Sequence, residues 1–314
     1  MRIRLTAFAL ILLLIVVPAL AQPTSYPLTI ENGDRELVFD KAPEHAVSLN
    51  GHTTEIMLSL GLADRMVGTA YNDDPILPEL QADYDRIPVL AGSGSYPSAE
   101  VVAGAGADFT YGRLSAYRDT AVGTFDKLAE LGIKAYAVKG TLINNAGMDD
   151  VYEDISNLGR IFDIQDRANA LIEKMKGEIA ATHAKVAGVE TPVKVMVFDS
   201  GKTDIYTAGK ALETHLIELA GGKNVFDDVD DTWAHVSYEL AVERDPDVIV
   251  INDYRDESAQ QKIDALKANP ALASIAAIRN DRFVVLPLSS VFEGVRNPEA
   301  VHVLASGFYP DLFK

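Results

Sequence analysis

Short apolar runs alternate along the chain with longer segments in which apolar residues recur every three or four positions. Short apolar runs predict buried strands, and the longer spacing predicts helices that pack one face on a sheet. The first half predicts a hairpin from 28–30 and 37–39, strands at 46–49, 66–68, 109–111 and 135–138, and helices at 53–60, 99–105 and 122–131. The second half predicts strands at 193–198, 248–251 and 283–286, and helices at 212–219, 260–268 and about 298–307. The alternation indicates an α/β fold in each half.

One long helical pattern separates the two halves. Its apolar face is formed by Ile164, Ala168, Leu171, Ile172, Met175 and Ile179, and the pattern ends before Gly188 and Pro192. A helix of about two dozen residues is about 35 Å long at 1.5 Å per residue, which is long enough to join two lobes. A single rigid connector of this kind predicts limited closure of the lobes rather than a wide hinge motion.

The first 21 residues have the layout of a secretory signal peptide. Arg2 and Arg4 precede an apolar run over 7–17, and Ala19-Leu20-Ala21 is a small-x-small cleavage site. A short membrane anchor is the alternative, but Pro18 and the cleavage site follow the run at once. The chain is therefore divided into a signal peptide (1–21), an N-terminal α/β lobe (22–160), an interlobe helix (161–190) and a C-terminal α/β lobe (191–314).

The absence of cysteine bears on the compartment of the protein, and its acidic charge excludes some classes of partner. The chain has no cysteine, which leaves no residue for a lipid anchor and predicts a protein released into the periplasm. Its formal net charge is −18, and removal of Arg2 and Arg4 with the signal peptide makes it −20. Such an acidic protein is a poor nucleic-acid binder and is repelled by anionic lipid. We expect a monomer without a cofactor that meets the membrane only through a partner protein.

A short pattern occurs once in each half of the chain. Ser98, Glu100 and Asp108 have the same spacing as Ser237, Glu239 and Asp247, and each set precedes a predicted strand. Serine is a good N-cap, and a glutamate in the first turn interacts favourably with the helix dipole. The repeat predicts two lobes of similar build. Capping alone is sufficient to explain both glutamates, so a further role for them stays open at this point.

Several segments together resemble one known family. They are PEHAVSL at 43–49, TEI at 54–56, LGLADRMVG at 60–68, LGI at 131–133, GGKNVF at 221–226 and VSYE at 236–239. In order and spacing the chain resembles the periplasmic binding proteins of the ferric-siderophore, haem and vitamin B12 ABC importers. The resemblance implies two Rossmann-like lobes joined by one long helix, with a ligand cleft between them. It also implies a small-molecule metal chelate as ligand, an ABC transporter permease with its cytoplasmic ATPase as partner, and no catalysis.

The same resemblance gives the repeated glutamates a role. In that family one glutamate on each lobe, at the rim of the cleft, docks into arginine pockets of the permease, and the matching positions here are Glu100 and Glu239. Charge complementarity of this kind orients docking more than it adds affinity.

Ligands of open α/β sheets bind beyond the carboxyl ends of the strands, and this rule selects the ligand-binding candidates. They are His52, Tyr71, Tyr96, Arg113, Trp233, His235, Tyr254 and Arg296. Trp233 is the only tryptophan and lies in the polar stretch 227–235, where an aromatic ring can stack on a flat ligand or a cation. Arg296 either binds an anionic ligand group or pairs with Glu293 or Glu299.

Two other functions remain as alternatives. His52 and His235 are weak candidates for metal ligands, and a free-metal receptor would need further ligands such as Glu293 or Asp253. A secreted hydrolase would use Ser48 or Ser200 as its nucleophile. Neither serine lies in a Gly-x-Ser-x-Gly turn, and the sequence has no His-Glu-x-x-His motif.

Overall fold

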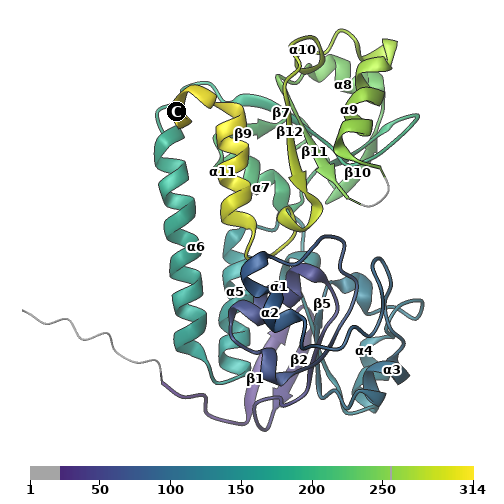
Figure 1. Ribbon diagram of the computed structural model, residues 1–314, viewed down its shortest axis with the longest axis vertical. Coiled ribbons are helices and arrows are strands. Elements are labelled where there is room, and N and C mark those ends of the chain that lie inside the picture. The colour runs from purple at the N-terminus through teal and green to yellow at the C-terminus, as the bar shows by residue number, and fades with distance from the viewer. Residues whose placement is uncertain (1–21, 255–256) are drawn as a thin grey trace, which may run out of the picture.

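The computed structural model describes residues 22–254 and 257–314, so the predicted signal peptide lies outside the described residues. Two lobes are arranged one above the other, the N-terminal lobe below and the C-terminal lobe above, and one long helix runs beside both (Figure 1). Each lobe contains a four-stranded parallel sheet with helices around it. This is the two-lobed α/β architecture that the sequence predicts.

The N-terminal lobe is built on a sheet with the strand order β4-β3-β5-β6. Its strands are β3 (Ala46–Ser48), β4 (Met66–Thr69), β5 (Phe109–Gly112) and β6 (Lys134–Ala137). Its helices are α1 (Gly51–Ser59), α2 (Gln81–Tyr84), α3 (Ala99–Gly104), α4 (Phe125–Glu130) and α5 (Met148–Ile161). The antiparallel hairpin of β1 (Leu28–Asn32) and β2 (Arg35–Phe39) precedes the sheet. Gly33 makes the turn of that hairpin with a φ of +68°, a conformation that glycine adopts without a steric cost.

The C-terminal lobe repeats the plan with the strand order β12-β11-β7-β9. Its parallel strands are β7 (Val193–Phe198), β9 (Gly222–Asn224), β11 (Val248–Asp253) and β12 (Phe283–Pro287). Its helices are α7 (Leu212–Leu219), α8 (Tyr238–Arg244), α9 (Ala259–Ala268), α10 (Ala276–Arg279) and α11 (Asn297–Phe308). A separate antiparallel pair, β8 (Ile205–Ala208) and β10 (Trp233–Val236), lies beside this sheet.

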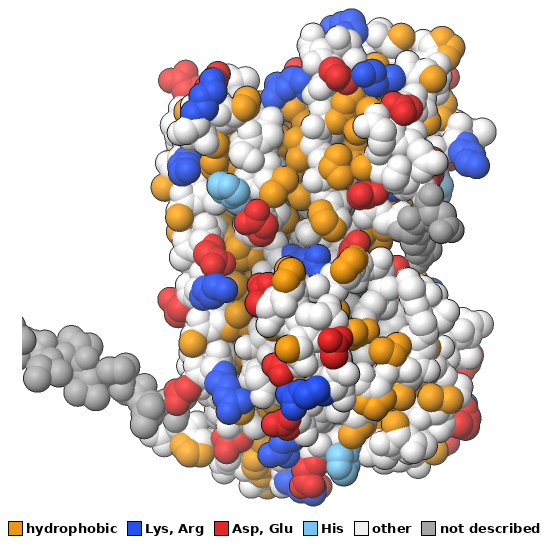
Figure 2. All heavy atoms as spheres, in the orientation of Figure 1, with side chains coloured by type: hydrophobic (Ala, Val, Ile, Leu, Met, Phe, Trp, Pro, Cys, Tyr) orange, Lys and Arg blue, Asp and Glu red, His pale blue; other side chains and the backbone are white. Residues whose placement is uncertain are grey.

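The long helix α6 (Gln165–Val186) has the predicted position and the predicted apolar face. Ala168, Ile172, Met175 and Ile179 are buried along it, and it packs on α5 of the N-terminal lobe and on α11 of the C-terminal lobe. These residues belong to one apolar core that continues from the N-terminal sheet to the C-terminal sheet, whereas the other face of each sheet has a core of its own. Charged side chains cover the outer side of α6, and apolar side chains appear where it meets the lobes (Figure 2).

The repeated sequence pattern corresponds to a repeated structure. Ser98 caps α3 by accepting a hydrogen bond from the backbone N–H of Val101, and Ser237 caps α8 in the same way. The aspartate before each following strand then binds the start of a neighbouring strand. Asp108 accepts hydrogen bonds from the backbone before β3, and Asp247 accepts one from the backbone of β7. The two lobes therefore share a helix-to-strand unit in which the serine cap and the aspartate contact are both repeated.

The structure contains elements that the sequence patterns did not predict. The helix α5, the strand β9 and the β8–β10 pair are additional, and the predicted helix at 122–131 is shorter, because α4 begins after its N-cap Thr124. The core face of α5 is formed by Met148, Val151, Ile155, Leu158 and Ile161 at helical spacing. Trp233 and His235, at the end of the polar stretch 227–235, belong to strand β10.

Helix α5 also brings a carboxyl group into the core. Asp154 is buried, accepts a hydrogen bond from the Tyr136 hydroxyl at 2.7 Å and accepts another from the Lys139 backbone N–H at 2.9 Å. Burial disfavours the charged carboxylate more than these two hydrogen bonds favour it, so the pKa of Asp154 rises from 3.8 to about 8. At neutral pH the folded protein therefore tends to hold this carboxyl group protonated.

This raised pKa predicts a pH-dependent stability. An acid with a raised pKa in the folded state binds its proton more tightly there, so its contribution to the unfolding free energy is complete below about pH 4 and is lost as the pH rises towards 8. In denaturant titrations between pH 5 and 8, the unfolding free energy of the wild type should fall more steeply with pH than that of Asp154→Asn. If the unfolding free energies of the two proteins changed with pH in parallel, the raised pKa of Asp154 would be contradicted.

Candidate ligand-binding site

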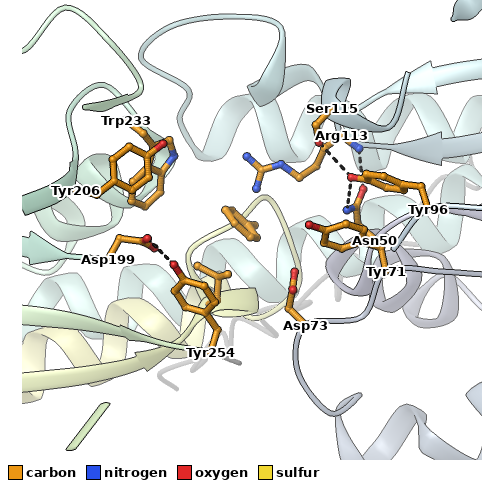
Figure 3. A pocket seen from close by; sticks show the side chains of 12 residues that line it. Asn50, Tyr71, Asp73, Tyr96, Arg113, Ser115, Asp199, Tyr206, Trp233 and Tyr254 are labelled. Atoms are coloured by element: carbon orange, nitrogen blue, oxygen red, sulfur yellow. Dashed lines mark hydrogen bonds between the residues drawn. The ribbon is translucent and has the colours of Figure 1, made fainter. Parts of the chain in front are cut away.

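A cavity of about 270 Å³ lies between the two lobes. Most of its lining comes from aromatic and polar side chains, which converge on it from both lobes (Figure 3). The lining residues are Asn50, Tyr71, Asp73, Tyr96, Arg113, Ser115, Asp199, Tyr206, Trp233, Tyr254, Leu288 and Phe292. Figure 3 shows Asn50, Tyr71, Asp73, Tyr96, Arg113 and Ser115 opposite Asp199, Tyr206, Trp233 and Tyr254.

The parallel sheets explain why these residues meet. Asn50, Tyr71 and Arg113 follow the carboxyl ends of β3, β4 and β5, and Asp199 and Tyr254 follow β7 and β11. The carboxyl ends of the strands in a parallel sheet all lie at one edge, and here the edges of the two sheets face the same cavity. The position of the site is therefore a direct consequence of the topology.

Hydrogen bonds and ring contacts hold the N-terminal wall of the cavity. The Asn50 side-chain amide donates to the Tyr96 hydroxyl at 3.1 Å, and its carbonyl accepts from the Arg113 backbone N–H at 2.9 Å. The Tyr96 hydroxyl also lies 3.1 Å from the Ser115 hydroxyl, and the rings of Tyr71 and Tyr96 are 4.4 Å apart. Tyr71 has a φ of +54°, a strained conformation that costs about 1–3 kcal/mol and is common at binding sites. This wall is therefore largely arranged before a ligand arrives.

The C-terminal wall contains the carboxylate of Asp199 and three aromatic side chains, and a cation is buried behind it. The Tyr254 hydroxyl donates to Asp199 at 2.6 Å, and the rings of Tyr206 and Trp233 stack with centroids 5.8 Å apart. Lys262 is buried behind this wall, where its ammonium donates to the backbone carbonyls of Asp199 and Asn252 at 2.6 Å each. The same ammonium lies 4.1 Å from the centre of the Tyr254 ring. Burial lowers the pKa of Lys262, although Asp199 acts in the opposite direction.

Arg113 and Phe292 meet at the centre of the cavity lining. The guanidinium of Arg113, from the N-terminal lobe, lies 3.8 Å from the ring centre of Phe292, from the C-terminal lobe. The lining otherwise contains two carboxylates, Asp73 and Asp199. Among the described residues, the lining has two carboxylates, one guanidinium and six aromatic side chains, which suits a flat or bulky ligand.

Five of the eight predicted ligand residues line the cavity, namely Tyr71, Tyr96, Arg113, Trp233 and Tyr254. His52, His235 and Arg296 do not. His52 is the second residue of α1 and is buried, and its Nε2 has no hydrogen-bond partner among the described residues. Burial, with a smaller contribution from Arg113, holds the pKa of His52 well below its ordinary value, so the ring is neutral. His235 belongs to β10, has an exposed side chain and pairs with Asp204 at 3.0 Å.

Arg296 forms a buried ion pair between the lobes. Its guanidinium donates to both carboxylate oxygens of Glu55, at 2.8 and 2.5 Å, and to the backbone carbonyl of Pro75 at 2.5 Å. Only 1% of the Glu55 side chain and 12% of the Arg296 side chain are exposed. This corrects the expected pairing, because the partner is Glu55 of the N-terminal lobe and not Glu293 or Glu299. Neither residue of the pair lines the cavity.

Arg296 is one anchor of a longer contact between the lobes. We call residues 289–296 the interlobe loop. At its start, Asp74 accepts hydrogen bonds from the Ser289 backbone N–H at 2.7 Å and from the Ser289 hydroxyl. In its middle, the Phe292 ring lies between Arg113 and His52, and at its end Arg296 binds Glu55. A segment of the C-terminal lobe is thus fixed to the N-terminal lobe at successive points.

The candidate metal ligands form no cluster in the described part of the chain, and Ser48 is hydrogen-bonded to neighbouring hydroxyls. Within 22–254 and 257–314 no group of three or more His, Cys, Asp or Glu could hold a metal ion. Asp253 accepts a hydrogen bond from the backbone N–H of Ala259 at the start of α9. Ser48 is buried with the hydroxyls of Thr54 and Thr69, to which it is hydrogen-bonded. No observation in the described part of the chain favours the free-metal receptor or the hydrolase.

Several lining residues were not predicted as ligand residues. Asp199 directly follows the predicted strand at 193–198, so the same rule that selected Tyr254 could have selected it. Tyr206 could not be found in this way, because it lies on β8 and that strand was not predicted. Asp73 and Ser115 lie in loops where only the folded structure shows which side chains face inward.

Comparisons with known proteins agree with this geometry. A family model described as periplasmic binding protein matches residues 47–289. An uncharacterised ABC transporter substrate-binding lipoprotein, YvrC of Bacillus subtilis (strain 168), is 27% identical over 92% of this chain and 88% of its own length. A vitamin B12-binding protein of Yersinia pestis (strain Pestoides F) is 24% identical over 77% of this chain and 81% of its own.

Solved structures give the same result. A periplasmic binding protein from Veillonella parvula is 32% identical with a TM-score of 0.83, covering 90% of this chain and 97% of that chain. An ABC-type Fe³⁺-hydroxamate transport system protein from Saccharomonospora viridis is 27% identical with a TM-score of 0.79, covering 90% and 99%. The chain therefore belongs to the periplasmic binding protein family. No helix in the described part of the chain is long and apolar enough to cross a bilayer.

The buried pair between Glu55 and Arg296 predicts a large effect on stability. Arg296→Met leaves the Glu55 carboxylate buried with only the Leu77 backbone N–H as a donor, which should lower the unfolding free energy by about 3–5 kcal/mol. Arg86→Met, which removes a surface ion pair with Asp64 and Asp83, should cost about 1 kcal/mol or less.

The double variant Glu55→Leu/Arg296→Met should recover most of the loss, since it leaves no buried charge without a partner. Guanidinium denaturation followed by circular dichroism measures all four proteins. A loss in Arg296→Met no greater than in Arg86→Met would show that the interlobe pair contributes little.

Proposed function

We propose that this protein is the solute-binding component of an ABC importer and acts in the periplasm. It captures a metal chelate in the cavity between its lobes and delivers the chelate to the permease in the membrane. A ferric siderophore is the ligand we favour, and corrinoids and haem are the other chelates that a site of this kind suits. The protein itself catalyses no reaction in this proposal.

One observation carries the proposal: an aromatic cavity lies between two parallel sheets, at the carboxyl ends of their strands. Ligand sites of open α/β proteins lie at this edge, and apolar pockets with a few convergent polar groups are typical binding sites. The names of the relatives agree, since one is an ABC transporter substrate-binding lipoprotein, one binds vitamin B12 and one belongs to an Fe³⁺-hydroxamate transport system.

The charges of the cavity refine the ligand class. Among the described residues, Asp73 and Asp199 line it together with the guanidinium of Arg113. A chelate with several negative charges would lose its hydration in the cavity while lying beside these two carboxylates, which is costly. A ferric hydroxamate of neutral or positive charge avoids this cost. We therefore place neutral and cationic chelates ahead of catecholate chelates, which are polyanions.

The repeated glutamates supply the proposed contact with the permease. Glu100 and Glu239 are exposed on α3 and α8, which lie at opposite ends of the molecule along its long axis (Figure 1). Lys127 donates a hydrogen bond to Glu100, with nitrogen and oxygen 2.8 Å apart, and holds the pKa of Glu100 at about 2. Two charged points that are far apart can fix the orientation of both lobes on a membrane partner.

The double variant Glu100→Ala/Glu239→Ala separates ligand capture from delivery. It should bind ferrioxamine B, a ferric hydroxamate, within about twofold of the wild-type affinity in calorimetry, because neither residue lines the cavity. Uptake of the ⁵⁵Fe-labelled chelate by cells that carry the cognate permease should fall at least about tenfold, since two charge contacts with the permease are lost.

The matched control is Glu130→Ala/Glu243→Ala, which removes two other exposed helical glutamates, one from each lobe, and should leave uptake unchanged. Unchanged uptake in the Glu100/Glu239 variant would contradict the docking role. Failure of the wild type to bind ferrioxamine B, cyanocobalamin or haemin would contradict the proposed ligand class.

A further inference from the structure

A second cavity of about 200 Å³ adjoins the interlobe cavity, and we call it the annex. The two cavities share Arg113, Ser115, Trp233 and Phe292 as lining, so the stacked pair of Arg113 and Phe292 stands between them. The remaining lining of the annex is Leu114, Arg118, Gly140, Thr141, Ala211, Leu212, Thr232, Val291 and Glu293. The annex therefore adjoins the main cavity along these shared side chains.

Glu293 is the unusual residue of this lining. It is 95% buried, since only 5% of its surface is exposed, and its Oε2 accepts no hydrogen bond within the described part of the chain. Its carboxylate lies against the backbone at Gly140, where even a Cβ would collide with it. A buried acceptor without a donor costs about 1–3 kcal/mol, and proteins rarely leave one unsatisfied. The annex therefore contains an acceptor for which residues 22–254 and 257–314 supply no donor.

The surroundings of Glu293 define which group could supply that donor. Ala211, Leu212 and Val291 give the annex apolar walls. The charged residues of its lining are Arg113, Arg118 and Glu293, so an entering group meets two guanidiniums as well as one carboxylate. A carboxylate arm would be repelled by Glu293 but attracted by Arg113 and Arg118, and it has no N–H to donate to Oε2. An N–H group, as in a primary amide or an ammonium, would donate to Oε2 and complete its hydrogen bonding.

We propose that the annex is a subsite for a ligand arm that carries an N–H donor, with Glu293 as its acceptor. This proposal deepens the proposed function and rests on it, because it takes the main cavity as the place of the ligand. It assigns Glu293 a role in selection, because its unpaired acceptor favours chelates with amide or amine arms. Phe292 and Arg113 form the boundary that the arm passes.

Two chelates with different arms provide the test. Cyanocobalamin carries primary amides around its ring, whereas haemin carries carboxylates and no N–H arm. Calorimetry would compare the wild type with Glu293→Leu, which removes both carboxylate oxygens, and with Glu293→Gln, which keeps one acceptor. Glu293→Leu should weaken cyanocobalamin binding about tenfold, the effect of one lost charge-assisted hydrogen bond, and Glu293→Gln should weaken it less. Haemin binding should stay equal or become tighter in both variants.

The matched control is Glu213→Gln, another fully buried glutamate of the C-terminal lobe that lines neither cavity. It should change the affinity for neither chelate, and thermal unfolding would confirm that all variants are folded. Equal losses for cyanocobalamin and haemin in Glu293→Leu would overturn the proposal, because they would indicate a general disturbance of the site. An unchanged affinity for cyanocobalamin would overturn it too.

A second experiment needs no chelate. Crystals of the ligand-free protein soaked in acetamide should show the amide in the annex, with its nitrogen within hydrogen-bond distance of Glu293 Oε2. An annex that holds only water after the soak would overturn the proposal, since water then suffices as the donor. If cyanocobalamin, haemin and ferrioxamine B all fail to bind the wild type, the proposed ligand class fails while the acetamide result still decides the role of the annex.

Discussion

The apolar face of α6 is the constraint on which the rest of the structure depends. Met175 and its neighbours on this face are buried in a core that extends into both lobes, through α5 on one side and α11 on the other. A rotation of one lobe against the other would expose part of this face to water, at about 25 cal/mol for each Å² of apolar surface. The helix therefore fixes the two sheets so that the carboxyl ends of their strands face one cavity.

The interlobe loop adds a second constraint at the cavity itself. Asp74, His52, Arg113 and Glu55 of the N-terminal lobe all contact this loop of the C-terminal lobe. With a helix beside the lobes and a loop anchored between them, the walls of the cavity are held in place without a ligand. Such preorganisation lowers the entropy lost on binding and favours small adjustments of side chains over large movements of lobes.

The sequence predicted the features that depend on local pattern. The apolar spacing of 164–179 predicted α6, and the serine caps at Ser98 and Ser237 predicted the two matching helix-to-strand units. The rule of the strand ends then predicted five lining residues, including Arg113 and Tyr254. These successes share a cause, since each depends on residues close in sequence or on a general property of parallel sheets.

The features that the sequence did not predict depend on contacts between distant segments. Glu55 and Arg296 are 241 positions apart, and nothing in either local pattern indicates that they pair. Strand β10 contains Trp233 and His235 because it pairs with β8, and the short polar sequence around it resembles a loop. His52 follows strand β3, as the rule requires, but it belongs to the first turn of α1. Its ring is buried there, with its centre 5.4 Å from the centre of the Phe292 ring.

The position of Trp233 has an optical consequence. The chain contains one tryptophan, and that indole lies in the cavity wall, stacked on Tyr206 and shared by the main cavity and the annex. Excitation at wavelengths that tryptophan absorbs and tyrosine does not would therefore excite Trp233 alone. Its emission reports the polarity and quenching of that place alone, and an iron or cobalt chelate beside it would accept its energy. The fluorescence of Trp233 can therefore report ligand binding without an added label.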